Sequence, residues 1–179
     1  DFQDLISIYF QIKLINWLGW LFYTSSIKIT IFKTRVKNMK TDVCIVGDGI
    51  VGRTLSLLLA QTGLEVTLVQ ATTPTSTSTT PDVRAYALSA ASQGILESVR
   101  AWPSNPQDIG PISAMRIFDG QHLPVRFDAK AMQTSALAFM VAAPTLLDSL
   151  AQAIRFNPKI TLANQAQEAT LQVICEGRS

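Results

Sequence analysis

A glycine-rich turn between two short apolar runs constrains the fold of this chain more than any other feature. The first run, residues 41–46, leads into Gly47, Gly49 and Gly52, and a second run follows at residues 64–69. Strand, glycine turn, helix and second strand in this order form the pattern of a βαβ unit that binds a dinucleotide. Glycines alone are weak evidence, but the flanking strands and helix supply the context that the fingerprint needs.

Each glycine has its own physical reason. Gly47 permits a tight turn at the end of a buried strand, Gly49 leaves the main chain bare beside a pyrophosphate, and Gly52 lets the helix cross close to the sheet. The first N–H groups of the helix, at Ile50 and Val51, would then point at the phosphates with the positive end of the helix dipole behind them. The alternative is that the glycines serve only the packing of helix on strand.

The spacing of the apolar residues after the turn predicts a helix. Val51, Leu55, Leu58 and Leu59 form one stripe, which predicts an amphipathic helix. Gly63 is a suitable left-handed cap at its carboxyl end.

Two positions depart from the usual fingerprint. The second strand of such units usually ends in an acidic residue that accepts hydrogen bonds from a ribose, whereas this chain has Gln70, a weaker, uncharged acceptor. Asp48 lies inside the turn, where a carboxylate would repel a pyrophosphate unless it points away. We expect it to point to solvent.

Length and charge limit the remaining possibilities. The 179 residues, 47% of them hydrophobic, can build one good core or slightly more. The net charge of +2 is unevenly divided, because residues 1–40 carry six Lys/Arg and two Asp, and residues 41–179 carry nine basic and eleven acidic residues. This distribution is not the basic footprint of a nucleic-acid-binding protein, so no nucleic-acid partner is expected.

The cysteines and the single histidine do not suggest a metal site. Cys44 and Cys175 lie inside strand-like runs without metal-type spacing, and His122 sits in an expected turn. We expect two reduced core thiols in a cytoplasmic protein, no metal, and no catalytic side chain among them.

The first forty residues differ in composition from the rest. Residues 1–38 contain no alanine, whereas residues 41–179 contain 19. We interpret residues 1–38 as a segment outside the domain that arises from upstream translation. Alternatively, the apolar residues 5–23 form a membrane-spanning or interfacial helix, although Lys13 at the midpoint makes spanning costly.

The region after the βαβ unit is of mixed character. Residues 71–81 are rich in Thr, Ser and Pro, which predicts a loop. Arg84 follows, and its guanidinium could bind a cofactor phosphate or ring carbonyl, or be an ordinary solvated side chain. Two strands, 112–118 and 125–128, with an Asp-Gly turn signal between them, predict an antiparallel insertion. The other expected elements are a helix at 89–98, a strand at 137–141, a helix at 144–154 and strands at 160–162 and 169–175.

Several motifs in a fixed order carry a family resemblance. They are the glycine unit, Asp82-x-Arg84-x-x-Ala87-Leu88, Trp102, the strand Pro111-Ile112-x-x-Met115-x-Ile117-x-Asp119, and the final Glu176-Gly177-Arg178-Ser179. Over residues 39–179 the chain resembles the ubiquinone-biosynthesis hydroxylases, which are FAD-dependent aromatic monooxygenases with the para-hydroxybenzoate hydroxylase fold.

The resemblance implies an α/β fold: a Rossmann-like FAD-binding βαβ domain at 39–179 with an antiparallel β insertion, truncated before the substrate domain. It implies that the three glycines hold the FAD pyrophosphate and that Gln70 stands at the ribose position. Arg84 would lie near the flavin. Glu176 and Gly177 fall where the family has an Asp-Gly pair near the cofactor and pyridine-nucleotide phosphates.

The implied reaction uses NAD(P)H to reduce FAD and O₂ to hydroxylate the phenolic ring of a polyprenylated substrate. Because the cofactor supplies the chemistry, no catalytic side chain is expected. We expect a cytoplasmic location, at the periphery of the inner membrane, which would suit such a substrate. Two alternatives stay open: a catalytically inactive fragment, and an NAD-dependent Rossmann dehydrogenase, which would continue with alternating βα units directly after Val69.

Overall fold

The computed structural model describes residues 41–70, 82–118, 120 and 125–175. The segment 1–38, the Thr-rich stretch 71–81 and the site candidates Glu176 and Gly177 lie outside the described residues. Within the described part of the chain, no helix has the length and apolar character needed to cross a membrane.

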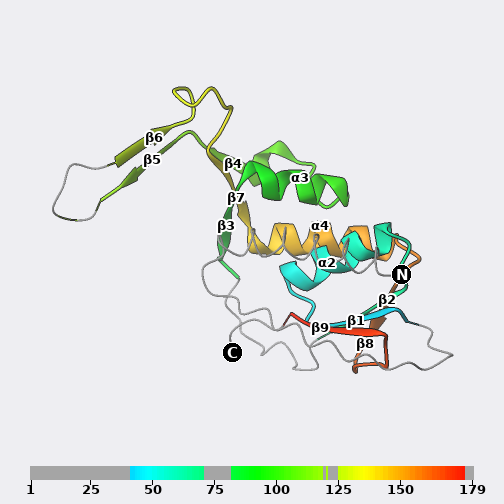
Figure 1. The fold of residues 1–179 in the computed structure, drawn as a ribbon. Helices are drawn as coiled ribbons and strands as arrows, with labels where there is room; N and C mark the ends of the chain where they lie inside the picture. Colours follow the sequence, from blue (N-terminus) through cyan, green and yellow to red (C-terminus); the bar gives the residue numbers. More distant parts are fainter. Residues whose placement is uncertain (1–40, 71–81, 119, 121–124, 176–179) are drawn as a thin grey trace.

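A four-stranded parallel sheet forms the base of the molecule. Its strands are β1 (Val43–Val46), β2 (Val66–Val69), β8 (Ile160–Ala163) and β9 (Leu171–Ile174), in the spatial order β8-β2-β1-β9. The central strand β1 is almost entirely apolar and buried, as expected for a strand covered on both faces. Figure 1 shows this sheet below the helices.

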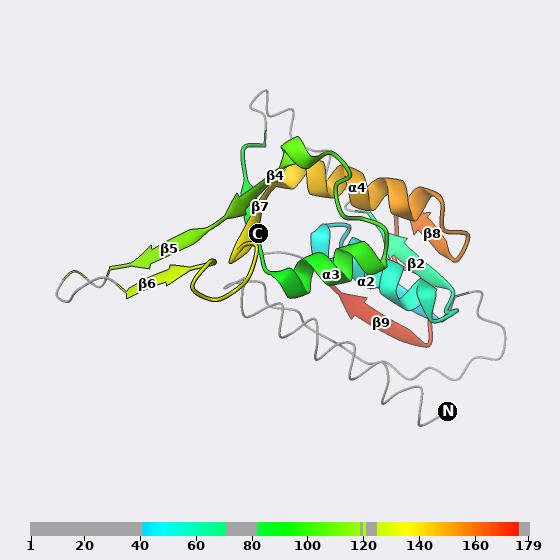
Figure 2. The same cartoon turned by 90° about the horizontal axis from the view of Figure 1, so that it is seen from above.

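Two helices lie side by side on one face of this sheet, as the two views in Figures 1 and 2 agree. They are α2 (Ile50–Gln61) and α4 (Ala143–Arg155). A third helix, α3 (Ala90–Ser98), lies beyond them on the side away from the sheet. As predicted, the chain leaves α2 through a left-handed glycine, Gly63, with φ of +92°.

One apolar core joins the sheet to the helices. Leu55 and Leu59 of α2 face it, as the predicted stripe requires, together with Leu146 and Leu150 of α4. Ile45 of β1 lies beneath them with no exposed surface. Each of these fully buried side chains contributes about 1.5–3 kcal/mol of hydrophobic free energy to folding.

The segment between β2 and α4 builds antiparallel structure, which confirms the expected insertion. A three-stranded sheet has the order β3-β7-β4, with β3 (Ala85–Leu88), β4 (Ile109–Ile112) and β7 (Ala138–Ala142). A short 3₁₀ helix, Pro106–Asp108, precedes β4. A separate two-stranded ribbon of β5 (Ala114–Ile117) and β6 (Val125–Asp128) projects from the body (Figures 1 and 2).

Two details differ from the expectation. The segment expected as one strand at 112–118 divides at Ser113, because β4 pairs with β7 while β5 pairs with β6. The carbonyl oxygen of Ser113 accepts a hydrogen bond from the N–H of Ala129 at 2.8 Å. This bond joins the break between β4 and β5 to the first residue after β6. The strand β3 was not expected and pairs with β7 from Ala85↔Ala142 onward.

Shortening a core leucine tests the assignment of the core. We expect Leu150→Ala to lower the free energy of unfolding by about 2–5 kcal/mol, because the side chain has no exposed surface. Leu162→Ala is the matched control, since Leu162 is 50% exposed and its loss should cost well under half as much. Urea unfolding measures both, and equal losses would contradict this core.

Candidate dinucleotide site at the glycine turn

The glycine turn lies at the junction of β1 and α2, as the sequence predicts. Gly47 directly follows β1 with φ of +111°, a left-handed conformation that favours glycine. Its N–H donates to the carbonyl oxygen of Val69 at 3.2 Å, so the turn is tied to the end of the neighbouring strand β2. The turn therefore sits at the carboxyl edge of a parallel sheet, where ligands of such sheets bind.

Gly52 is required by close packing. A Cβ atom added to it would lie 1.9 Å from the carbonyl oxygen of Gly47 and 3.5 Å from Cβ of Cys175. Neither backbone can yield without moving the helix or the turn. The predicted close approach of α2 to the sheet is confirmed at this residue.

Gly49 lacks a side chain for a different reason. No atom of the described residues lies within 4 Å of a Cβ added there, and its φ of −72° suits any residue. The fold therefore does not need glycine at this position, and the main chain faces open space. A bare backbone bordered by space fits a diphosphate that must approach the peptide groups closely.

The amino end of α2 is prepared for an anion. Within the part of the chain that the structure describes, no side chain caps it, and no acidic residue lies in its first turn, which contains Ile50 and Val51. By contrast, α3 is capped by Ser89, whose Oγ accepts the N–H of Ser92 at 3.2 Å. The first N–H groups of α2 and the positive end of its dipole can therefore act on a negatively charged ligand.

Gln70 lies at the same edge as the turn. It directly follows β2, and the register Val46↔Val69 places the ends of β1 and β2 next to each other. Its N–H donates to the carbonyl oxygen of Ala163 at 2.8 Å, which fixes the main chain. The structure thus brings Gln70 together with the three glycines.

Asp48 has a partner that was not expected. Rather than extending freely into solvent, its side chain is only 26% exposed, and Oδ2 lies 3.5 Å from a terminal nitrogen of Arg53. Arg53 was not among the residues predicted from the sequence. The available signal was a cation at the fourth position of a helix, where the positive end of the dipole disfavours it.

Arg84 is placed at the start of the antiparallel sheet. Its carbonyl oxygen accepts the N–H of Ala143, the first residue of α4, at 2.8 Å. Its side chain is 67% exposed, and its guanidinium donates two hydrogen bonds to the carboxylate of Asp82, at 2.8 and 2.7 Å. These bonds lower the pKa of Asp82 to about 2 and raise the pKa of Arg84. A role for Arg84 near a flavin stays a prediction.

The carboxyl end of β9 also reaches the glycine turn. The N–H of Cys175 donates to the carbonyl oxygen of Val46 at 2.7 Å. Cys175 and Cys44 are both buried free thiols, as predicted, and burial raises the pKa of Cys175 to about 11. The last described residue, Cys175, therefore lies beside Gly52.

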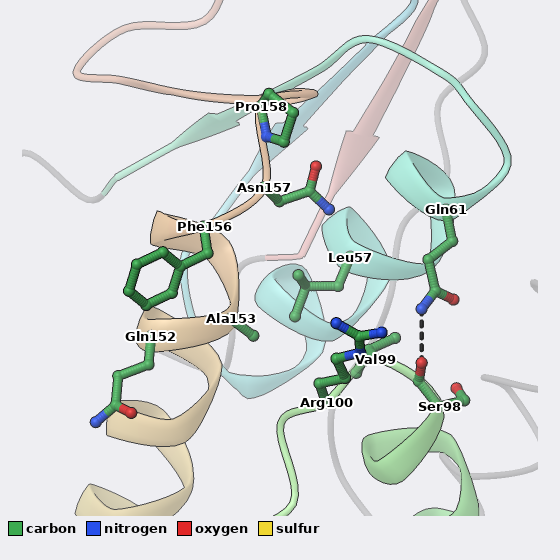
Figure 3. Close-up of a pocket in the computed structure, with 10 residues that line it drawn as sticks. All are labelled: Leu57, Gln61, Ser98, Val99, Arg100, Gln152, Ala153, Phe156, Asn157 and Pro158. Atoms are coloured by element: carbon green, nitrogen blue, oxygen red, sulfur yellow. Dashed lines mark hydrogen bonds between the residues drawn. The ribbon is translucent and has the colours of Figure 1, made fainter.

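A separate cavity of about 660 Å³ opens at the other end of the helices (Figure 3). Gln61 of α2 and Phe156 after α4 line it, together with Arg100, and Nε2 of Gln61 donates to the carbonyl oxygen of Ser98 at 2.6 Å. Because α2 rises about 1.5 Å per residue, this cavity lies roughly a helix length from the glycine turn. It is not part of the candidate site.

The packing of Gly52 can be tested by stability. We expect Gly52→Ala to lower the melting temperature strongly, because its methyl group would overlap the carbonyl oxygen of Gly47. Gly49→Ala is the control, since its methyl group meets open space and should leave the melting temperature within a few degrees. Similar melting temperatures for both variants would contradict the described turn.

The ion pair of Asp82 can be tested by titration. NMR should find the Asp82 carboxyl titrating at a pKa of about 2. Its lowered pKa means that the pair stabilises the fold at neutral pH and is lost as the pH falls from about 4 towards 2. In Arg84→Gln the pKa of Asp82 should return towards its usual value, while that of Asp128, which is lowered by Ala131 and Arg126, should not move. An unchanged Asp82 would contradict the pairing.

Comparison with known proteins shows the family of this chain. The family model described as an FAD binding domain matches residues 40–170. The 3-demethoxyubiquinol 3-hydroxylase of Escherichia coli K12 is 34% identical over 128 residues, which cover 70% of this chain and 33% of that protein. The ubiquinone hydroxylase UbiL of Rhodospirillum rubrum is 28% identical over 139 residues, covering 77% and 32%. The chain thus spans about a third of the length of these relatives.

Solved structures agree in fold. The flavin-dependent monooxygenase PieE, in complex with FAD and substrate, has a TM-score of 0.51 at 18% identity over 71% of this chain and 24% of its own. The 2-methyl-3-hydroxypyridine-5-carboxylic acid oxygenase has a TM-score of 0.51 at 15% identity, covering 69% and 32%. The Rossmann-like fold and the resemblance to ubiquinone hydroxylases are therefore confirmed. Because the family model covers most of the chain and its glycines form the expected turn, this chain belongs to the FAD binding domain family.

Proposed function

We propose that this chain is the N-terminal, FAD-binding part of a flavin-dependent monooxygenase that hydroxylates an aromatic ring in ubiquinone biosynthesis. The observation that carries the proposal is the open amino end of α2 beside Gly49, where the main chain borders free space. The similarity to two ubiquinone hydroxylases supports the choice of reaction. We assign the domain to residues 39–179 and leave residues 1–38 outside it.

In this proposal the chain binds the cofactor mainly through its backbone. The N–H groups of Ile50 and Val51 at the start of α2 hold the diphosphate, and Gly47, Gly49 and Gly52 allow its approach.

The other proposed contacts come from side chains and from the end of the chain. The Gln70 amide oxygen accepts a hydrogen bond from a ribose hydroxyl. Arg84 lies near the flavin, and Glu176 and Gly177 lie near the cofactor phosphates.

When bound, FAD would take a hydride from NAD(P)H and use O₂ to hydroxylate a polyprenylated phenol. The residues of this chain then need only bind and orient the cofactor and exclude water from the reacting ring. A protein with such a lipid-soluble substrate would work in the cytoplasm at the surface of the inner membrane. As a part of the enzyme, the chain is expected to be inactive alone.

The element order argues against an NAD-dependent dehydrogenase. After β2 the described chain forms β3, α3 and the antiparallel strands, and it returns to the parallel sheet later, at β8 and then β9. A dehydrogenase built on alternating βα units would place its next parallel strand directly after the second one. The other alternative is an inactive fragment that binds no ligand. Such a fragment would contain no flavin, whereas our proposal predicts bound flavin.

Flavin absorbance of the purified chain separates these functions. Bound flavin supports the proposal, NAD binding without flavin supports the dehydrogenase, and binding of neither supports the inactive fragment. Adding FAD to the purified chain guards against loss of the cofactor during purification.

A single substitution tests the site itself. We expect Gly49→Val to abolish FAD binding, because the side chain would fill the space in front of the turn. The melting temperature of the chain without cofactor should stay within a few degrees of the unsubstituted chain, since no neighbouring atom is crowded. Gly94→Val, at a glycine of α3 with equally open surroundings, is the control and should keep its flavin. Full flavin content in Gly49→Val would refute this site.

A further inference from the structure

Arg53 occupies an unusual position between three parts of the molecule. It is the fourth residue of α2, and its side chain is only 19% exposed. Its Nε donates to the carbonyl oxygen of Asp48 at 2.6 Å, and a terminal nitrogen donates to the carbonyl oxygen of Leu147 in α4 at 2.9 Å. One planar guanidinium thus joins the glycine turn, its own helix and the neighbouring helix.

The charges of Arg53 and Asp48 are each unfavourable alone. A cation near the amino end of a helix opposes the dipole, and a carboxylate in a turn that binds a diphosphate repels the ligand. Side by side, with Oδ2 of Asp48 3.5 Å from Arg53, the two charges compensate each other. Because both side chains are largely shielded from water, solvent alone would screen the carboxylate only in part.

The hydrogen bonds add a geometric effect. By accepting from Arg53, the carbonyl oxygen of Asp48 is held by a side chain that also bonds the carbonyl oxygen of Leu147 in α4. The peptide that follows it leads into Gly49, the residue whose main chain borders open space. A lysine could supply the charge, but its single ammonium lacks the planar fork that reaches the carbonyls of both Asp48 and Leu147.

We propose that Arg53 is a positioning residue for the diphosphate: it neutralises the carboxylate of Asp48 and holds the glycine turn so that peptide N–H groups, not negative charge, face the ligand. The inference rests on the proposed FAD binding and extends it to a residue pair. In this pairing Asp48 is tolerated inside an anion-binding turn because of Arg53.

A double-mutant cycle with FAD affinity as the readout tests this pair. The variants are Arg53→Gln, Asp48→Asn and the double variant, and fluorescence titration with FAD gives Kd at low and high salt. Arg155→Gln is the matched control, because it removes one positive charge from the other end of α4. Circular dichroism verifies that each variant is folded.

The expected results follow from the charges. Arg53→Gln should weaken FAD binding about tenfold or more at low salt, and the difference should shrink in about 0.5 M salt, because screening weakens the repulsion from Asp48. Asp48→Asn should bind FAD at least as tightly as the unsubstituted chain. The double variant should recover to within about threefold of Asp48→Asn, since no carboxylate is left uncompensated. Arg155→Gln should not change Kd.

Contrary outcomes separate this inference from the function. If the unsubstituted chain binds FAD and Arg53→Gln binds it equally well, or if the double variant does not recover, the role of Arg53 is refuted and the function stands. If neither the unsubstituted chain nor Asp48→Asn binds FAD, both proposals fail. Should Arg53→Gln not fold, Arg53→Lys decides. It keeps the charge but loses the planar fork, so it should bind FAD more weakly than the unsubstituted chain at both low and high salt, and an affinity equal to that of the unsubstituted chain would overturn the positioning role.

Discussion

The contact between Gly52 and the carbonyl oxygen of Gly47 sets the position of everything else in the candidate site. With no side chain between them, the first turn of α2 lies directly against the end of β1. This closeness aims the amino end of the helix along the carboxyl edge of the sheet. The same contact leaves Gly49 at the rim, where the main chain is open. Within one turn, Gly52 thus allows the close packing and Gly49 leaves access for a ligand.

The local part of this arrangement could be predicted from the sequence, because its determinants lie close together in the chain. The apolar stripe with Leu55 and Leu59 required a helix after the turn, and Gly63 marked its end. The strands of the parallel sheet were legible because they are apolar runs bounded by polar or glycine residues. The assignment of three glycines to a strand-to-helix junction followed from spacing alone.

The features that escaped prediction depend on distant parts of the chain. The strand β3 exists because Ala85 pairs with Ala142 of β7, and its own residues carry only a weak pattern. The bond from Arg53 to Leu147 spans 94 positions and forms only because α2 and α4 lie side by side. Asp48 was expected in solvent although its partner, Arg53, is close in sequence, because the bond that helps to fix the Arg53 side chain goes to the distant Leu147. The ligand contacts of Arg84 and of Glu176 depend on a bound cofactor and stay predictions.

The order of strands in the parallel sheet has a consequence for how the domain is made. Val43 of the central strand pairs on one side with Val66 and on the other with Leu171. On a ribosome, β1 and β2 emerge early and can pair through α2, but one edge of β1 waits until residue 171 has been synthesised. Pairing strands that are so distant in the chain requires the closure of a long loop, and the entropy lost in closing that loop slows folding. The nascent chain therefore carries a half-formed sheet with an open edge while the residues between β2 and β9 are synthesised, the interval in which a chaperone would matter most.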